Sequence, residues 1–483
     1  MEDRVKAKYD VIIGLEVHAQ LNTQSKIFNS DSTAFGNKPN ANISEITLAH
    51  PGTLPKLNKK ALEYAIKMGL ACQSTISREM IFDRKNYFYP DSPKGYQITQ
   101  DRTPVCVGGQ LVITKSTGEK RAIQLNRIHL EEDAGKSIHL DGEEDSLIDF
   151  NRSGVPLIEI VTEPVIHTSE NAQALLTEIR RLVRYLEICD GNMEEGSLRC
   201  DANISIMPKG ATEFGKKVEI KNMNSIKSVG KAIDFEIDRQ IGLVEKGVSI
   251  ASETRDFNAE TGVTTGMRTK EELNDYRYFP DPDLSPVHVS EEWLAEIEAQ
   301  MPAMPWELLN KFIGEYGLPE YDANVLIDDK NTAVYFQDVC KYTHNFKAVS
   351  NWLMGPVKSY LNEKGLDITA LKLSPEKLAE LISLVEDNKV SFSIASQRLL
   401  PALVNTEKPV AALAKELNLI QVSDVRAIEE IVVNVLDAYP DKVKAYRSGK
   451  KGLLGMFVGE VMKRSKGKAD PKIANELLIN KLS

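Results

Sequence analysis

The chain has 483 residues, of which 42% are hydrophobic and 27% charged, and its net charge is −10. This length predicts several domains, each large enough to bury a core. The composition is ordinary for a globular protein, and no run approaches the roughly 18 apolar residues that cross a bilayer, which excludes an integral membrane protein. The amino terminus is charged, without an apolar signal region, so we expect a cytoplasmic protein that does not contact membranes.

The cysteines are few, odd in number and widely spaced, and none form a Cys-x-x-Cys pair. This spacing fits reduced, buried thiols better than a disulfide framework, and it argues against a structural zinc site. The five are Cys72, Cys106, Cys189, Cys200 and Cys340.

Residues 1–295 are predicted to form a mixed α/β domain. Short β-like runs occur at 9–21 and 154–161, and leucine and isoleucine recur at helical spacing over 169–186. Proline density then rises at 280–286 and 301–305, where the pattern changes. The fold class expected for the whole chain is α+β, with this domain first and helical domains after it.

Residues 296–405 are predicted to be all helical. In 374–385, for example, Ser374 is a suitable N-cap and Pro375 falls in the first turn. A second break at 405–409 separates a small helical tail domain, 406–483, with an amphipathic segment at 425–436 and an apolar one at 453–462. The segment from Asp441 to the end contains eleven basic and four acidic residues. Its net charge is +7, which leaves −17 for the rest of the chain.

The first strand-like run carries polar residues on one face. Its two-residue repeat sets Ile13, Leu15 and Val17 on one side and Glu16, His18 and Gln20 on the other. Such a face can be a simple solvated surface, so this segment alone leaves both interpretations open.

Further carboxylates lie inside apolar runs. Glu159 stands in Pro156-Leu-Ile-Glu-Ile-Val161, where a lone buried carboxylate would cost several kcal/mol, so we expect a cation beside it. Asp201 shares a strand face with Asn203, Glu219 shares one with Lys221, and His129-Leu-Glu-Glu-Asp133 adds more acidic groups. Oxygen ligands with an occasional imidazole suit Mg²⁺, which usually bridges to phosphates and so suggests ATP.

Familiar nucleotide motifs are absent from the sequence. Gly210-Ala-Thr-Glu-Phe-Gly-Lys216 approaches a phosphate-binding loop, but Lys217 stands where Ser or Thr should follow. There is also no dinucleotide fingerprint or nucleophile elbow. The segment 83–97 interleaves basic and aromatic residues, which fits either a nucleotide contact or a rigid surface loop.

Several motifs together resemble the B subunit of aspartyl/glutamyl-tRNA amidotransferase, nearly from end to end. They are Ile13-Gly-Leu-Glu-Val-His18, Phe82-Asp-Arg-Lys-Asn-Tyr-Phe-Tyr-Pro-Asp91, Glu131-Glu-Asp-Ala-Gly-Lys136, Asn151-Arg152, Pro156-Leu-Ile-Glu-Ile-Val161, Met193-Glu-Glu-Gly-Ser-Leu-Arg-Cys-Asp-Ala-Asn203 and Asp275-Tyr-Arg-Tyr-Phe-Pro280.

The resemblance implies that ATP phosphorylates the side-chain carboxylate of Glu-tRNA(Gln) or Asp-tRNA(Asn), and that ammonia then displaces the phosphate. An acyl phosphate has the good leaving group that a carboxylate lacks. Residues 1–295 would be the catalytic cradle. The implied catalytic metal ligands are Glu16, His18, Glu132 (preferred over Glu131), Glu159, Asp201 and Glu219, and the implied nucleotide contacts are Lys85, Asn86, Tyr87 and Arg199.

The resemblance also implies partners. A glutamine-hydrolysing A subunit would supply ammonia, and a small C subunit would complete a heterotrimer. The tail would bind the tRNA body through Lys450, Lys451, Lys463, Arg464, Lys466, Lys468 and Lys472. Some family members carry zinc-binding cysteines, but this chain lacks the required pairs, so we expect no zinc. Two rival functions remain: a ligase resembling glutamine synthetase that acts on a free amino acid, and a non-catalytic tRNA-binding scaffold.

Overall fold

The computed structural model describes residues 3–115, 117–140, 142, 144–269, 276–420, 425–465 and 469–482. These residues form two compact units, Met1–Met304 and Pro305–Ser483. Each unit has its own fold and is described by itself. None of the helices in the described ranges is long and apolar enough to span a membrane.

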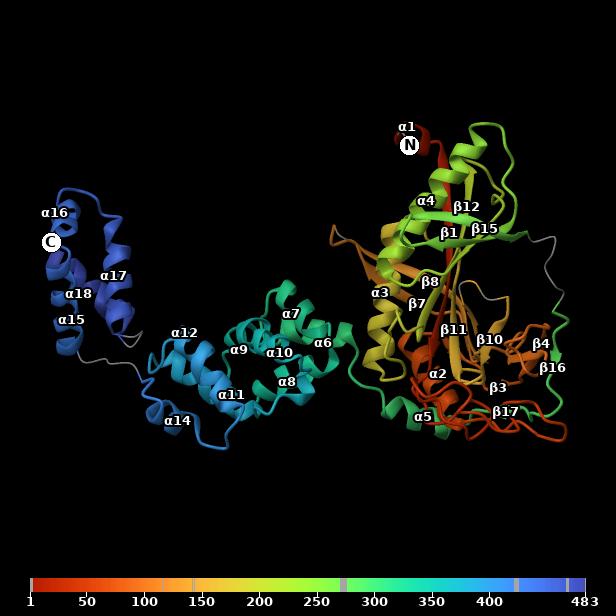
Figure 1. Ribbon diagram of the computed structural model, residues 1–483, viewed down its shortest axis with the longest axis horizontal. Coiled ribbons are helices and arrows are strands. Elements are labelled where there is room, and N and C mark those ends of the chain that lie inside the picture. Colours follow the sequence, from red (N-terminus) through yellow and green to blue (C-terminus); the bar gives the residue numbers. More distant parts are fainter. Residues whose placement is uncertain are drawn as a thin grey trace. The chain divides into compact units, whose positions relative to one another are not determined.

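The first unit is built on a ten-stranded, mostly antiparallel sheet (Figure 1). Its strand order is β15-β14-β13-β12-β1-β11-β8-β6-β2, with β7 also paired to β8. The bounds of these strands are β1 Tyr9–Gln20, β2 Thr75–Ile76, β6 Cys106–Val107, β7 Gln110–Thr114, β8 Lys120–Glu132, β11 Pro156–Thr162, β12 Leu198–Pro208, β13 Val218–Lys221, β14 Glu253–Asn258 and β15 Val263–Thr269.

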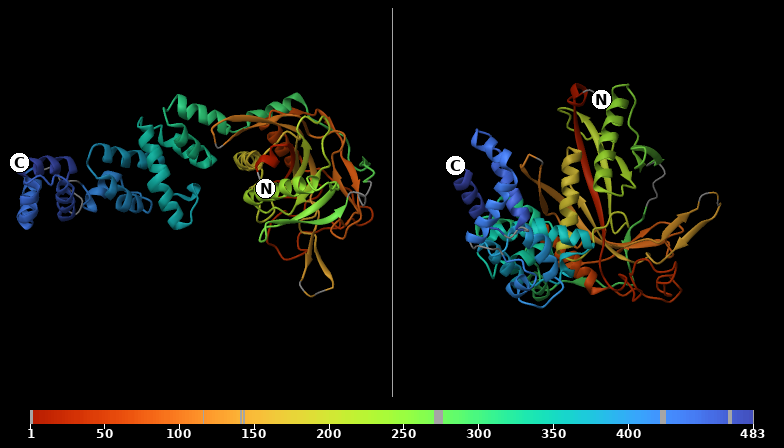
Figure 2. Two further views of the ribbon diagram at one scale, coloured as in Figure 1. Left: turned by 90° about the horizontal axis from the view of Figure 1, so that it is seen from above. Right: turned by 60° about the vertical axis from the view of Figure 1, so that its left-hand side comes forward.

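Helices cover the apolar face of this sheet. They are α2 Lys59–Ala71, α3 Ser169–Tyr185 and α4 Ile226–Val244, and Figure 2 shows α3 and α4 lying along one side of it. Thr168 and Ser225 cap α3 and α4 by accepting from backbone N–H groups in the first turn. Ile13, Leu15 and Val17 of β1 are fully buried in the core with leucines and isoleucines of these helices. The predicted apolar face of the first strand is therefore confirmed.

Smaller elements flank the sheet. The segment 83–97, whose role the sequence left open, contributes a hairpin of β4 and β5 that also pairs with β16. A second hairpin, β9–β10, projects from the unit (Figure 2). The remaining elements of this unit are α1 Asp3–Lys6, β3 Glu79–Met80, β4 Asp83–Asn86, β5 Tyr96–Thr99, β9 Lys136–His139, β10 Ser146–Asp149, β16 Phe279–Pro280, β17 Val287–His288 and α5 Glu291–Ala299.

The second unit consists of helices and the loops that join them, with no named strand in its described residues. Ser374 caps α11 and Pro375 is its first residue, as the sequence predicted. The last four helices enclose a separate core that includes Phe457, Val461 and Leu478. The helices are α6 Pro305–Gly314, α7 Glu320–Ile327, α8 Lys330–Val339, α9 Phe346–Trp352, α10 Lys358–Lys364, α11 Pro375–Glu386, α12 Phe392–Ile394, α13 Leu400–Leu403, α14 Val410–Glu416, α15 Val425–Ala438, α16 Pro440–Arg447, α17 Leu453–Arg464 and α18 Pro471–Leu482.

The α+β fold class is confirmed. The boundary between the two units falls between Met304 and Pro305 in the sequence, and α5 includes the expected boundary at 295 and 296. Division of the helical part near residue 405 stays a prediction.

Candidate active site

Polar side chains gather on the sheet face opposite the helices. They come from five strands in the order β13-β12-β1-β11-β8. In antiparallel pairs, directly opposed residues share a face. His18 lies opposite both Glu159 and Arg199, and Glu159 lies opposite His129 in turn. One row across four strands thus places one carboxylate, Glu159, among three basic side chains, those of Arg199, His18 and His129.

The first group of candidate ligands is His18, Glu131 and Glu159, whose ligand atoms lie within 4.8 Å of one another. His18 Nε2 is 3.3 Å from Glu159 Oε2 and 3.8 Å from Glu131 Oε1. A second imidazole lies close to the same two carboxylates. His129 Nε2 is 3.5 Å from Glu131 Oε2 and 3.3 Å from Glu159 Oε2. The cation that the sequence predicted beside Glu159 is thus a pair of imidazoles.

The second group is Glu16, Asp201 and Glu219, with ligand atoms equally close together. Glu16 lies directly opposite Asp201, and Asn203 lies opposite Glu219. The Asn203 amide donates to Glu16 Oε1 at 2.9 Å. Five of the six ligands predicted from the sequence therefore lie in these two groups.

The electrostatics of the two groups differ. Burial alone would raise the pKa of Glu159, but hydrogen bonds from His129 and His18 outweigh it and hold that pKa well below its ordinary value. Burial likewise opposes protonation of His129, yet its two carboxylate partners raise its pKa to about 9. Burial and the nearby Glu159, Glu219 and Asp201 carboxylates raise the pKa of Glu16. The positive charge near Glu16 is therefore too small to offset its burial and the neighbouring carboxylates.

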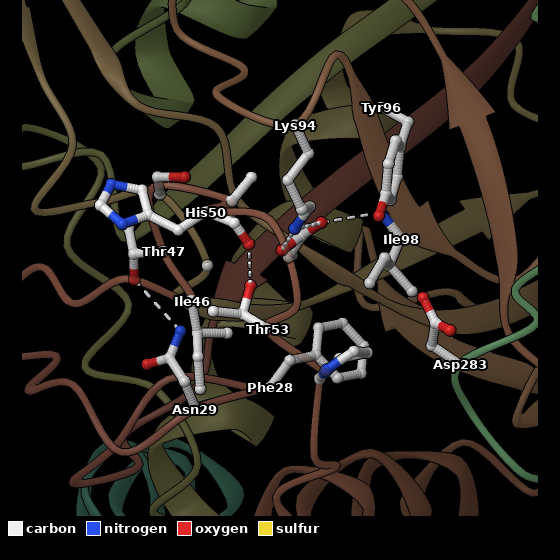
Figure 3. A pocket seen from close by; sticks show the side chains of 15 residues that line it. Phe28, Asn29, Ile46, Thr47, His50, Thr53, Lys94, Tyr96, Ile98 and Asp283 are labelled. Carbon is white, nitrogen blue, oxygen red and sulfur yellow. Dashed lines mark hydrogen bonds and ion pairs between the residues drawn. The ribbon is translucent and has the colours of Figure 1, made fainter.

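Glu132 faces away from both groups, and it is Glu131, not the preferred Glu132, that lies in the first group. Alternation along β8 places Glu131 with His129 on the polar face and Glu132 with Leu130 on the other. Glu132 accepts from Lys94 Nζ at 2.6 Å and from the Ile98 amide at 2.8 Å. It lines a cavity of about 100 Å³ whose labelled walls include Phe28, Thr47 and Lys94 (Figure 3).

The four predicted nucleotide contacts lie in two places. Lys85 is near the first group: burial would lower its pKa, but Glu131 and Tyr278 outweigh burial and raise it. The Asn86 amide is already bonded to the backbone carbonyls of Tyr276 and Arg277. Arg199, beside His18, donates to Asp133 at 2.8 Å. Burial and Asp91 raise the pKa of the Tyr87 phenol.

The predicted tRNA contacts lie in the second unit. Lys450, Lys451, Lys463, Arg464 and Lys472 are exposed on or beside the last helices. Lys466 and Lys468 lie outside the described residues. All five cysteines are buried and free, and neither candidate metal group contains one.

Sequence reasoning left three residues of this site without a role. His129 and Glu131 alternate with the apolar Ile128 and Leu130 at the end of β8, so assigning Ile128 and Leu130 to the core face would have placed both on the polar face. Lys221 was noticed only as a neighbour of Glu219. Its contact with Asp201 depends on the pairing of β12 with β13, which a single sequence does not disclose.

Comparison with known proteins agrees with this architecture. A family model described as the GatB/GatE catalytic domain matches residues 11–295, and one described as the GatB domain matches residues 334–482. The B subunit of an aspartyl/glutamyl-tRNA(Asn/Gln) amidotransferase from Thermodesulfovibrio yellowstonii is 49% identical over 98% of each chain. Proteins of the same name from Thermosynechococcus vestitus and Caldicellulosiruptor bescii are each 48% identical, over 100% and 98% of this chain and 98% and 99% of their own.

The sheet with its two acidic groups is thus the catalytic domain of an amidotransferase component. The chain belongs to the family of amidotransferase B subunits, and the resemblance carried by its motifs is confirmed.

Proposed function

We propose that this chain uses ATP and Mg²⁺ to phosphorylate the side-chain carboxylate of an aspartate or glutamate attached to tRNA. The observation that carries the proposal is the convergence of two carboxylate groups, one of them with an imidazole, on one sheet face. Membership in the family supports the substrate class, since relatives across 98% or more of the chain are named for aspartyl- and glutamyl-tRNA.

The donor set fits magnesium. His18, Glu131 and Glu159 would hold one ion, and Glu16, Asp201 and Glu219 a second; carboxylate oxygens are the ligands that this hard cation prefers. When bound, Mg²⁺ would neutralise phosphate charge and orient the transferred phosphoryl group.

His129 orients the first group. It is buried, and its Nδ1 has no hydrogen-bond partner in the described part of the chain, so it meets the carboxylates through its Nε2–H. That N–H points at Glu131 and Glu159 together and keeps both carboxylates turned toward His18. Removing the His129 imidazole would therefore free the orientation of both carboxylates.

Cations near the first group are suited to anionic substrate oxygens. Lys85 is close enough to Glu131 for its pKa to respond to that carboxylate, and its Nζ lies 4.8 Å from the Tyr276 ring centre. Arg199 lies beside His18 in the register. We propose both as contacts to phosphate or to the acceptor end. Tyr87 is proposed beside them, and Asn86 only as an anchor because its amide is engaged.

Partners complete the reaction. Relatives are named as B subunits, so we propose an A subunit that releases ammonia from glutamine and a C subunit that completes a heterotrimer. Ammonia then attacks the acyl carbon and inorganic phosphate leaves, which gives Gln-tRNA(Gln) or Asn-tRNA(Asn). The exposed basic tail would hold the tRNA body by phosphate and 2′-hydroxyl contacts.

The test traps the acyl phosphate without ammonia. The purified complex receives ATP, Mg²⁺, hydroxylamine and Glu-tRNA(Gln) or Asp-tRNA(Asn), and the aminoacyl hydroxamate is measured. ATP-dependent hydroxamate on the tRNA-bound amino acid is expected. Hydroxamate formed equally well from free glutamate or aspartate would favour the ligase resembling glutamine synthetase. Tight tRNA binding without any hydroxamate would favour a scaffold.

A further inference from the structure

The second candidate group already contains a cation from the chain itself. Alternation along β13 sets Glu219 and Lys221 on the same face. Lys221 Nζ lies 2.5 Å from Asp201 Oδ2 and 3.3 Å from Glu219 Oε1. An ammonium thus contacts two of the three carboxylates that would hold the second metal ion.

The charge of the site explains why a lysine is needed there. Five carboxylates converge on one sheet face, and the two imidazoles lie beside only two of them, Glu131 and Glu159. Lys221 contacts two carboxylates of the other group, Asp201 and Glu219, through one ammonium. Without metal, removing Lys221 would leave Asp201 and Glu219 repelling each other.

A metal ion and this ammonium compete for the same oxygens. Mg²⁺ binds carboxylate oxygens at about 2.0–2.1 Å and demands near-octahedral geometry, so it leaves no room for an ammonium bonded to the same side of those oxygens. Lys221 can move away because its side chain is 35% exposed and its stem is flexible. The histidines of the first group are more enclosed, with 19% of the His18 and 4% of the His129 side chain exposed.

We propose that Lys221 is an exchangeable internal counter-ion that occupies the second metal position until the metal displaces it. This inference rests on the proposed function, because it takes the Glu16, Asp201 and Glu219 group as a metal site. It makes metal binding at that group conditional on a side-chain movement. The apparent metal affinity is then reduced by the fraction of molecules in which Lys221 holds the site.

The test compares metal affinity in matched lysine variants of the full-length chain within its complex. Lys221→Met removes the competing charge but keeps the length of the side chain. Lys217→Met is the control, since Lys217 is exposed, stands next to the same strand and lowers the pKa of Glu16 only through space. Lys221→Arg keeps a charge that can bridge two carboxylates. Mn²⁺ binding is followed by electron paramagnetic resonance of the free ion.

Lys221→Met should bind Mn²⁺ at its second site about three- to tenfold more tightly than the unmodified chain, because the site is vacant before the metal arrives. Lys217→Met should change this affinity by less than about twofold, because an exposed charge is largely screened. Lys221→Arg should bind no more tightly than the unmodified chain. The first site serves as an internal reference, since Lys221 does not contact its ligands.

Thermal unfolding gives a second measurement. In EDTA, Lys221→Met should unfold at a lower temperature than the unmodified chain. Saturating Mn²⁺ should raise the Tm of Lys221→Met by more than it raises the Tm of the unmodified chain. If Lys221 only organises the carboxylates, Lys221→Met will bind Mn²⁺ equally or more weakly, and the inference is overturned. If the unmodified chain binds no Mn²⁺, or Asp201→Asn does not weaken binding, the metal assignment of the proposed function fails instead.

Discussion

The polar sheet face and the basic tail use charge in opposite ways. On the sheet, carboxylates such as Glu131 and Glu159 are largely buried and each contacts other charged side chains. In the tail, Lys450, Lys463 and Lys472 are exposed to solvent. A buried charge depends on its particular neighbours, whereas a solvated charge contributes a small amount by itself. Single substitutions should therefore have large effects on the sheet and small, additive ones in the tail.

The largest effect is expected from neutralising one carboxylate of the second group. Asp201→Asn and Glu16→Gln should each reduce ATP-dependent activation at least about 100-fold, because each removes a proposed ligand of the Mg²⁺ ion that would stabilise phosphoryl transfer. Glutamine hydrolysis by the partner should stay at least partly intact. Hydroxamate formation and glutamate release are measured on the same preparation. Unmodified rates of amidation in either variant would rule out the metal assignment.

Removing the tail should instead affect tRNA binding. A chain that ends after Asn405 should bind tRNA about 10- to 100-fold more weakly near physiological salt and should show a flatter salt dependence. Each lost phosphate contact should reduce the slope of log K against log salt by roughly 0.7 to 0.9. Mn²⁺ binding is the control and should not change. Superimposable binding curves would show that the basic tail is only a solvated surface.

Neighbouring glutamates provide a sharper comparison within one strand. Glu131→Gln should weaken Mn²⁺ binding about tenfold, because Glu131 belongs to the first group with His18. Glu132→Gln should leave Mn²⁺ binding within about twofold, because Glu132 contacts Lys94 on the other face. The two variants have the same change of charge and differ by one position. Equal weakening by both would contradict the orientation of β8.

The same strand shows how far the sequence could predict the site. Alternation was strong in 9–21, where buried Ile13, Leu15 and Val17 identified the polar face correctly. The preference for Glu132 followed the resemblance, whereas the apolar Ile128 and Leu130 place Glu131 on the polar face and Glu132 on the other. Cross-strand contacts such as Lys221 with Asp201 join residues 20 positions apart, and strand pairing alone decides them. The alternation of apolar and polar residues can be recognised within one segment, but strand pairing depends on the whole sheet.

The smallest effect concerns Lys26, a buried lysine away from both groups. Its ammonium donates to the backbone carbonyls of Asn42 and Phe150 and lies within reach of the Thr47 hydroxyl, yet no carboxylate of the described residues touches it. Burial lowers its pKa from 10.5 to about 8. The unfolded chain therefore binds more protons than the folded one between these values, so this group adds stability as pH rises through about 8.

Between pH 7 and 8.5, the free energy of unfolding of the unmodified chain should therefore rise by up to about 1 kcal/mol relative to that of Lys26→Met. The difference between the two proteins isolates Lys26 from the thiols, which ionise in the unfolded chain over the same pH range. Lys56→Met is the matched control, because Lys56 is exposed and its loss should leave the pH dependence unchanged. Urea denaturation at a series of pH values measures the effect. Parallel pH profiles for the unmodified chain and Lys26→Met would contradict this prediction. They would mean that the three oxygens around the ammonium fully replace its hydration. A completely buried lysine would then behave like the solvated lysines of the tail.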